Sequence, residues 1–228
     1  MASLTTARTG VLGGRFDPIH HGHLETATVA RLALGLQRVL LVPSGRSPHR
    51  ASDARAIGAD RLAMVTLAAQ GLPHLAPSAL ELGIDAPSYT ALTLARLHDR
   101  GYDRTQLFFI VGADAFAEIA TWYDYPAVLE AAHFVVVSRP GYGVGGLADQ
   151  LPALRDRMRA IAGDGVPPDS DTGPRIWLLD TVTPSVSSTQ VRALLARQQS
   201  VTGLVPPAVA AYIAHHSLYD GPAMSLHD

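Results

Sequence analysis

The sequence predicts an α/β protein in which one doubly wound parallel sheet carries helices on both faces. Short apolar runs, typical of strands buried on both faces, alternate with helical patterns along the chain. Two of these runs, at residues 11–12 and 106–111, lead directly into glycine and then into polar residues. Parallel strands joined by right-handed crossovers end at one sheet edge, where open α/β sheets bind ligands.

In the first half of the chain, apolar periodicity separates helices from strands. Leu24, Ala27 and Leu34 recur at helical spacing, and Gly35 is suited to the left-handed conformation that ends a helix. Ile57 is expected to face inward from a second helix. The expected elements are a strand at 8–12, a helix at 22–34, a strand at 39–42, a helix at 53–70 and a strand at 79–82.

The second half continues the alternation. Ser88 is a natural N-cap for the next helix, and Pro206 and Pro207 suit the start of the last one. The expected elements are a helix from 88 to 101, a strand at 106–111, a strand at 134–137, a helix at 147–162, a strand at 175–179, a helix beginning at about 188 and a final helix beginning at 206–207.

The bulk composition narrows the class of protein. The chain has 228 residues, of which 47% are hydrophobic and 17% charged, as expected of one globular domain. A net charge of −2 gives no overall field for nucleic acid or anionic lipid, so any phosphate site must be local. No cysteine is present, and no apolar stretch reaches membrane-spanning length. We therefore expect a soluble cytoplasmic protein with neither nucleic acid nor a membrane as partner.

Residues 13–23, with the sequence GGRFDPIHHGH, are the most informative segment. Gly13 and Gly14 lack a Cβ, so a nucleotide can approach the backbone there. His20 and His23 would lie on one face of the first helical turn, beside free backbone N–H groups that favour phosphate. This arrangement would stabilise charge on a transferring phosphoryl group. Taken singly, the glycines could be a simple turn and the histidines a solvated surface or a metal site.

Further candidates follow other predicted strands. The loop at 43–50 carries His49 and Arg50, while Gly112 and Asp114 follow the strand at 106–111. Asp114 could equally serve as a helix N-cap. The three hydroxyl residues at 187–189 could all be capping groups, and Arg192 would reach an anion bound at the same helical turn.

The nucleophile-elbow pattern GxSxG and the Walker pattern GxxxxGK[ST] are both absent from the sequence. Glycine backbone, imidazoles, hydroxyls and arginine remain, and these groups suit catalysis by positioning and charge stabilisation. We therefore expect in-line attack by a substrate phosphate on the α-phosphorus of a nucleoside triphosphate, which releases pyrophosphate. Mg²⁺ would be held mainly by substrate phosphates and water rather than by a dedicated protein site.

The segment at 13–23 resembles the GxFDPxHxGH signature of the HxGH nucleotidyltransferases. Residues 186–192, VSSTQVR, resemble that superfamily's ISSTxxR motif. The segments at 88–90 and 121–123 further resemble the bacterial nicotinate-nucleotide adenylyltransferases, and the likeness spans nearly the whole chain outside 143–174. Arg15 departs from the signature, which usually has a small hydroxyl residue at that position.

This resemblance implies a Rossmann-like fold and transfer of AMP from ATP to nicotinate mononucleotide, giving deamido-NAD. The residues expected to contact the reacting phosphates are His20, His23 and Arg192. The residues expected to bind ATP are Gly13, Gly14, Phe16, Gly22, Gly112, Asp114, Arg139, Ser187 and Ser188. Those expected to bind nicotinate mononucleotide are His49, Arg50, Thr90, Trp122 and Tyr123. Trp122 would stack on the pyridine ring, although a core tryptophan is the alternative.

The resemblance also implies the organisation of the chain. We expect a single nucleotidyltransferase domain over 1–228, with a surface insertion at about 143–174 and a C-terminal helical segment at about 188–219. Three alternatives stay open: an enzyme that uses nicotinamide mononucleotide alone or with the acid, a transferase for another phosphate such as phosphopantetheine, and a non-catalytic nucleotide-binding module. The sequence leaves a homo-oligomer open.

Overall fold

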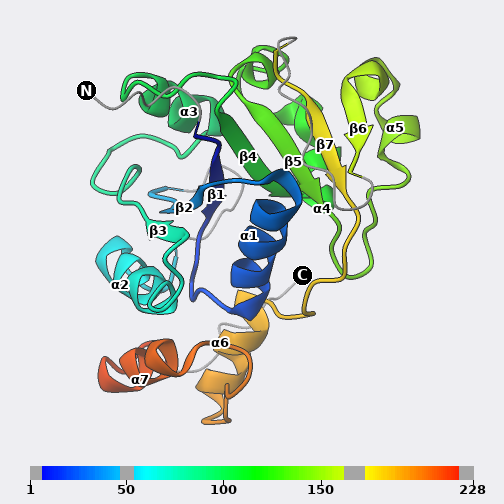
Figure 1. Ribbon diagram of the computed structural model, residues 1–228. Helices are drawn as coiled ribbons and strands as arrows, with labels where there is room; N and C mark the ends of the chain where they lie inside the picture. Colours follow the sequence, from blue (N-terminus) through cyan, green and yellow to red (C-terminus); the bar gives the residue numbers. More distant parts are fainter. Residues whose placement is uncertain (1–6, 47–53, 162–172, 221–228) are drawn as a thin grey trace.

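The computed structural model describes residues 7–46, 54–161 and 173–220, and its core is one parallel sheet (Figure 1). The strand order is β3-β2-β1-β4-β5-β7-β6, and every neighbouring pair is parallel. The predicted doubly wound α/β fold is therefore confirmed. The strands are β1 (Thr9–Gly14), β2 (Arg38–Pro43), β3 (Leu75–Pro77), β4 (Leu107–Gly112), β5 (His133–Val137), β6 (Met158–Ala160) and β7 (Ile176–Leu179).

Helices cover both faces of this sheet, and α1 crosses the face that Figure 1 turns toward the viewer. Among the described residues, no helix is long and apolar enough to cross a membrane. The α-helices are α1 (His21–Leu34), α2 (Gly58–Ala68), α3 (Thr90–His98), α4 (Ala113–Ala117), α5 (Leu147–Gln150), α6 (Ser188–Ala196) and α7 (Pro207–His215). The 3₁₀ helices are η1 (Ile119–Thr121), η2 (Ala127–Glu130) and η3 (Pro152–Arg157).

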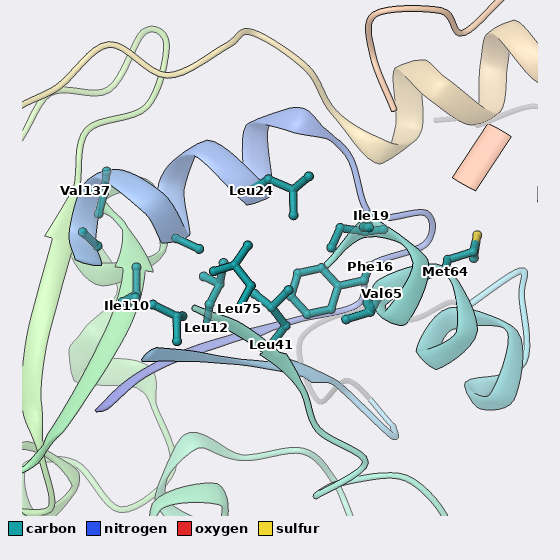
Figure 2. Close-up of a cluster of buried hydrophobic side chains, with 14 of the residues drawn as sticks. Leu12, Phe16, Ile19, Leu24, Leu41, Met64, Val65, Leu75, Ile110 and Val137 are labelled. Atoms are coloured by element: carbon teal, nitrogen blue, oxygen red, sulfur yellow. The ribbon is translucent and has the colours of Figure 1, made fainter. Parts of the chain in front are cut away.

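The buried side chains form two clusters, one on each face of the sheet. Successive strand residues alternate between them, so that Leu12 belongs to one cluster and Val11 to the other. The first cluster includes side chains from α1, α2, α6 and α7, and the second includes side chains from α3, α4 and α5. Figure 2 shows part of the first cluster, where Leu12 and Leu41 lie close to Phe16. Burial on both faces explains why the strands are continuous apolar runs.

The strand order places a topological switch point between β1 and β4. From β1 the chain proceeds to β2 and β3 on one side, and from β4 to β5 and β7 on the other. Leu12 pairs with Ile110 across this boundary, so the glycines that follow both strands lie at the same edge. In open α/β sheets a crevice forms at this position, and it binds the ligand.

Three local expectations are wrong near the first crossover. The strand expected at 79–82 is instead β3 at Leu75–Pro77, and residues 80–83 form a turn that lies against Gly45. A Cβ on Gly45 would lie 2.5 Å from the Glu81 carbonyl oxygen, so this approach requires glycine. Helix α2 begins only at Gly58, which leaves Ile57 as an exposed N-cap. Helix α3 begins at Thr90, and Ser88 accepts the Gly45 N–H instead of capping it.

The helix expected at 147–162 is also wrong. Helix α5 ends at Gln150, and the segment continues as η3 and then as β6, which pairs with β7 at the edge of the sheet. Pro152 lies at the start of η3, where its missing N–H prevents α5 from continuing. The part of 143–174 that the structure describes thus adds an edge strand to the sheet.

Candidate active site

Two adjoining cavities lie at the carboxyl edge of the sheet, at the β1–β4 switch point. The larger, which we call the main cleft, has a volume of about 380 Å³, and the smaller, the side cavity, about 360 Å³. They share His20, Arg139, Val186 and Ser187 as a common wall. Residues from both sequence motifs therefore lie between two spaces that are each large enough for part of a nucleotide.

The end of β1 lines the main cleft with backbone. Gly13 and Gly14 line it, and a Cβ on Gly14 would lie 3.2 Å from the Phe16 ring. Phe16 has a left-handed backbone (φ 47°), and its ring is buried beneath α1 (Figure 2). That ring meets the edge of the His23 imidazole at a centroid distance of 4.9 Å. Phe16 thus supports His23 from the core.

His20 and His23 lie together at the start of α1, as predicted. His20 is the N-cap of α1 and His23 lies in the first turn, and their rings stack at 3.7 Å. The His20 backbone N–H donates to His23 Nδ1 at 3.3 Å, so the proton of a neutral His23 is on Nε2. A Cβ on Gly22 would lie 3.1 Å from His20 Nδ1 and 3.3 Å from the Pro184 carbonyl oxygen. Glycine therefore allows this close approach of the loop before α6.

Both imidazoles are uncharged at neutral pH. Burial, helped by the positive charge of Arg139 and by His21, lowers the pKa of His20 to about 4. Burial, helped by His20 and Arg139, lowers the pKa of His23 well below its usual value. Each ring therefore offers one N–H donor without carrying a charge of its own. Among the described residues, His20 Nδ1 has no hydrogen-bond partner.

Arg192 reaches the same place from α6. Its guanidinium donates to the Asp17 carbonyl oxygen at 2.6 Å and to Thr189 Oγ1 at 3.2 Å. Ser187 is the N-cap of α6, where it accepts the Gln190 N–H. Of the three hydroxyl residues at 187–189, only Ser187 caps the helix. Both Arg192 and Ser187 line the main cleft, as the sequence predicted.

Ser188 also lines the cleft, and its hydroxyl donates to the Pro18 carbonyl oxygen at 2.9 Å. This bond joins the two sequence motifs, which lie 170 residues apart in the chain. Ser188 therefore holds the start of α6 against the loop that carries the histidines.

Asp17 is a supporting residue of the site that was not predicted from the sequence. The Asp17 side chain is 1% exposed and accepts the backbone N–H groups of Arg55 and Ala56 and the Tyr219 hydroxyl. Its Oδ2 also lies 3.8 Å from the Arg192 guanidinium. Burial, together with the Asp17 carboxylate, raises the pKa of Tyr219. The sequence signal for this role was an acid immediately before Pro18 within the phosphate-binding motif.

Gly112, Asp114 and Arg139 form the far side of the site, near the side cavity. Gly112 rather than Asp114 is the N-cap of α4. A Cβ on Gly112 would collide with the side chains of Arg139 and Asp114. Asp114 Oδ1 lies 3.5 Å from Arg139 Nε, and this ion pair is half exposed. Asp114 lines the side cavity, Gly112 lines the main cleft and Arg139 lines both.

The opposite end of the main cleft is aromatic. Tyr89 and Tyr123 stack at 4.6 Å, and Trp122 contacts the edge of Phe109 at 6.2 Å. Thr90 is the first residue of α3, and within the described chain neither its backbone N–H nor that of Tyr123 donates a hydrogen bond. An aromatic wall with two free N–H donors suits a flat ring that carries a carboxylate.

The sequence reasoning also missed Glu81 in this region. Glu81 is a buried residue that lines the main cleft and accepts the Thr93 hydroxyl. His49 and Arg50, both expected to bind the mononucleotide, lie outside the described residues.

The fold and this site together define an α/β protein of the nucleotide-binding type, with two cavities on either side of the segments at 13–23 and 186–192. The profile of the cytidylyltransferase-like family matches residues 11–194. A nicotinate-nucleotide adenylyltransferase of Roseiflexus sp. (strain RS-1) is 39% identical over 95% of this chain and 100% of its own length. A nicotinate-nucleotide adenylyltransferase of Pseudomonas putida (strain GB-1) is 40% identical over 94% of this chain and 96% of its own length. The chain belongs to the cytidylyltransferase-like family and, within it, to the nicotinate-nucleotide adenylyltransferases.

Solved structures agree on the fold. The nicotinic acid mononucleotide adenylyltransferase of Plasmodium falciparum, in complex with NaAD, has a TM-score of 0.69. The match covers 95% of this chain and 98% of that one at 16% identity. Its complex with APC has a TM-score of 0.66. The family and the fold class predicted from the sequence are thus confirmed.

The lowered pKa of His20 predicts a pH-dependent stability. The unfolded chain binds a proton near pH 6.5, whereas folded His20 does so only near pH 4, so this contribution is complete above pH 6.5 and is lost as the pH falls toward 4. Urea unfolding of the wild type and of His20→Asn between pH 4 and 8 measures this loss. The variant should show a shallower decline. Equal slopes in the wild type and in His20→Asn would contradict the assignment.

Proposed function

We propose that this protein transfers the AMP moiety of ATP to nicotinate mononucleotide and releases pyrophosphate, giving deamido-NAD in NAD biosynthesis. The observation that carries the proposal is the common wall of the two cavities. His20 and Ser187 line both spaces, so a donor nucleotide and an acceptor nucleotide would meet beside the histidine pair and Arg192. The names of the relatives and the full-length similarity support the same activity.

The reaction proceeds by direct in-line displacement. A phosphate oxygen of the mononucleotide attacks the α-phosphorus of ATP, and the bond to the bridging oxygen of pyrophosphate breaks. The N–H donors of His20 and His23 and the Arg192 guanidinium stabilise the negative charge on the transferring group. Because the imidazoles are neutral and held by the fold, they supply directed hydrogen bonds, while Arg192 supplies charge. The α6 N-terminus, with Ser187 and Ser188, adds backbone dipoles.

The nucleoside part of ATP would lie in the side cavity. Because Gly112 has no Cβ, the side chains of Arg139 and Asp114 can pack against its backbone, and both of these side chains line the side cavity. Asp114 would accept ribose hydroxyls, and Arg139 would face the phosphates. Gly13, Gly14 and Gly22 allow close approach along the phosphate motif, while buried Phe16 acts by supporting His23.

Nicotinate would lie against Trp122 with its carboxylate on the N–H groups of Thr90 and Tyr123. Two N–H donors favour a carboxylate over a carboxamide, because one side of the carboxamide is an NH₂ group that would meet another donor. The site therefore prefers the acid to the amide.

Mg²⁺ would enter the site already bound to the phosphates of ATP. Among the described residues, no group of three His, Cys, Asp or Glu side chains is placed to hold a metal. The carboxylate of Asp17 is already occupied by protein donors. The ion would thus be coordinated mainly by phosphate oxygens and water, and it would neutralise charge on the triphosphate.

The test is pyrophosphate release with ATP and Mg²⁺, run in parallel with nicotinate mononucleotide and nicotinamide mononucleotide. We expect kcat/KM to favour the acid by about 10-fold or more, since the amide leaves one donor unpaired. Comparable rates would indicate a dual-specificity enzyme. If neither mononucleotide supports pyrophosphate release, the proposed acceptor is wrong, and phosphopantetheine would then be tested. Turnover of any acceptor contradicts a purely binding role.

Replacement of His23 should reduce the chemical step. His23→Ala removes a buried donor aimed at the phosphates, so kcat should fall by about 10²-fold or more. Steady-state kinetics and thermal denaturation measure the two effects separately. His21→Ala is the matched control, because His21 lines neither cavity. A loss of the same size in both variants would show that His23 acts through the fold.

Replacement of Trp122 should instead weaken acceptor binding. Trp122→Ala removes the stacking surface, so the KM for the mononucleotide should rise while the KM for ATP changes little. Trp122 is half-buried and also contacts Phe109 and Phe134, so the Tm of the variant must be measured together with its kinetics. A collapse in Tm without a selective change in KM would make Trp122 a core residue.

A further inference from the structure

Arg15 is a charged residue in the main cleft to which the reaction described above assigns no role. It follows Gly14 at the end of β1, and its side chain is 17% exposed and lines the main cleft. Arg15 does not line the side cavity. The signature that this segment resembles has a small hydroxyl residue here, so the guanidinium is a departure in this chain.

No described residue hydrogen-bonds to the Arg15 guanidinium. Among the described residues, its ion-pair partner is Asp17, whose Oδ2 lies 4.0 Å from Nη2, beyond hydrogen-bonding distance. The Asp17 carboxylate is already satisfied, because it accepts the N–H groups of Arg55 and Ala56 and the Tyr219 hydroxyl. A largely buried guanidinium with five N–H donors is costly unless those donors face water or a ligand.

The charges around Arg15 are also unbalanced. Buried Arg61 donates to the carbonyl oxygens of Ala56 and Arg15, and Arg192 approaches from α6. Burial lowers the pKa of both Arg61 and Arg192, and the neighbouring charge of Arg15 lowers them further, while Asp17 opposes this effect. Among the described residues, the guanidinium groups of Arg15, Arg61 and Arg192 thus lie near the satisfied carboxylate of Asp17, and Arg55 adds a further positive charge beside Arg192.

Glu81 faces Arg61 from the acceptor end, but its carboxylate already accepts the Thr93 hydroxyl. Two carboxylates do not offset three guanidinium groups in a partly desolvated cleft. The excess of positive charge favours a bound anion at this position.

We propose that Arg15 binds the 5′-phosphate of the acceptor mononucleotide through its guanidinium. The inference rests on the proposed function and extends it by naming a residue that selects the phosphorylated acceptor over its nucleoside. Arg15 lines the space that also contains Thr90, Trp122 and Tyr123, the residues assigned to nicotinate. Arginine matches two phosphate oxygens at once, so it would both hold the acceptor and orient its attacking oxygen.

The test compares wild type, Arg15→Ser and Arg15→Lys. Calorimetry measures the Kd of nicotinate mononucleotide and of nicotinate riboside, which lacks the phosphate, and steady-state kinetics gives KM for both substrates. Arg15→Ser should weaken mononucleotide binding by about 10- to 100-fold, which is the usual loss for a charged hydrogen-bonding pair. It should leave the Kd of the riboside unchanged. Arg15→Lys keeps the positive charge but lacks the planar guanidinium, so its Kd for the mononucleotide should lie between those of the wild type and Arg15→Ser.

Controls separate this inference from folding and from the proposed function. Arg155→Ser also removes one positive charge, but at an exposed residue that pairs with Asp149 and lines neither cavity, so its constants should equal those of the wild type. Thermal denaturation of each variant checks the fold.

An unchanged Kd for the mononucleotide in folded Arg15→Ser would overturn the proposal. An equal loss for the riboside would do the same, because the effect would not involve phosphate. A rise confined to the KM of ATP would overturn the assignment to the acceptor and place the ATP phosphates at Arg15. If the wild type binds the mononucleotide but releases no pyrophosphate, the proposed function fails, and the calorimetric comparison still decides the role of Arg15.

Discussion

The buried carboxylate of Asp17 is the constraint on which the site depends. An ionised carboxylate cannot be removed from water without compensation, and here the compensation comes from three distant parts of the chain. The Arg55 and Ala56 amides precede α2, Tyr219 follows α7 and Arg192 lies on α6. Each supplies a donor or a charge to one residue of the phosphate motif. The position of the loop that leads to His20 and His23 is therefore set by the C-terminal third of the molecule as much as by β1 and α1.

The sheet order explains why the two sequence motifs can act together. The switch point between β1 and β4 opens one crevice, and both strands end there in glycine. Helix α6 packs on the same face as α1, so the hydroxyl of Ser188 reaches the Pro18 carbonyl oxygen. The parallel sheet thus brings residues 13–23 and 186–192 to the same crevice. Either motif alone would present only part of the donor set.

The sequence predicted the parts of the fold whose signal is local. Continuous apolar runs identified β1, β2, β4, β5 and β7, because strands buried on both faces contain little else. The predictions of a strand at 79–82 and of a helix at 147–162 were wrong, because edge strands as short as β3 and β6 have almost no periodicity of their own. In those segments, pairing with β2 or β7 decides the backbone conformation. Tertiary contacts outweigh local preference there.

The sequence predicted which residues of the two motifs lie together in the site, but it was less informative about the residues that support them. His20, His23 and Arg192 lie together because their motifs encode a helix start and a helix turn. The partners of Asp17 and Glu81 could not be predicted from the sequence, because only the folded chain brings them near. The same holds for the lowered pKa of His20, which follows from burial beside Arg139. Spacing along the chain carries no information about desolvation.

Desolvation also reconciles an acidic protein with a site for anionic substrates. The chain carries a net charge of −2, yet Arg15, Arg61 and Arg192 converge on one partly buried region. Charges in such a region interact more strongly than charges in bulk water, so a few arginines outweigh the overall balance. The two histidines add no charge to this cluster, because burial, helped by the positive charge of Arg139, lowers their pKa values and keeps them neutral. Charge and directed hydrogen bonding therefore come from different side chains: the arginines supply positive charge, and the neutral imidazoles supply N–H donors.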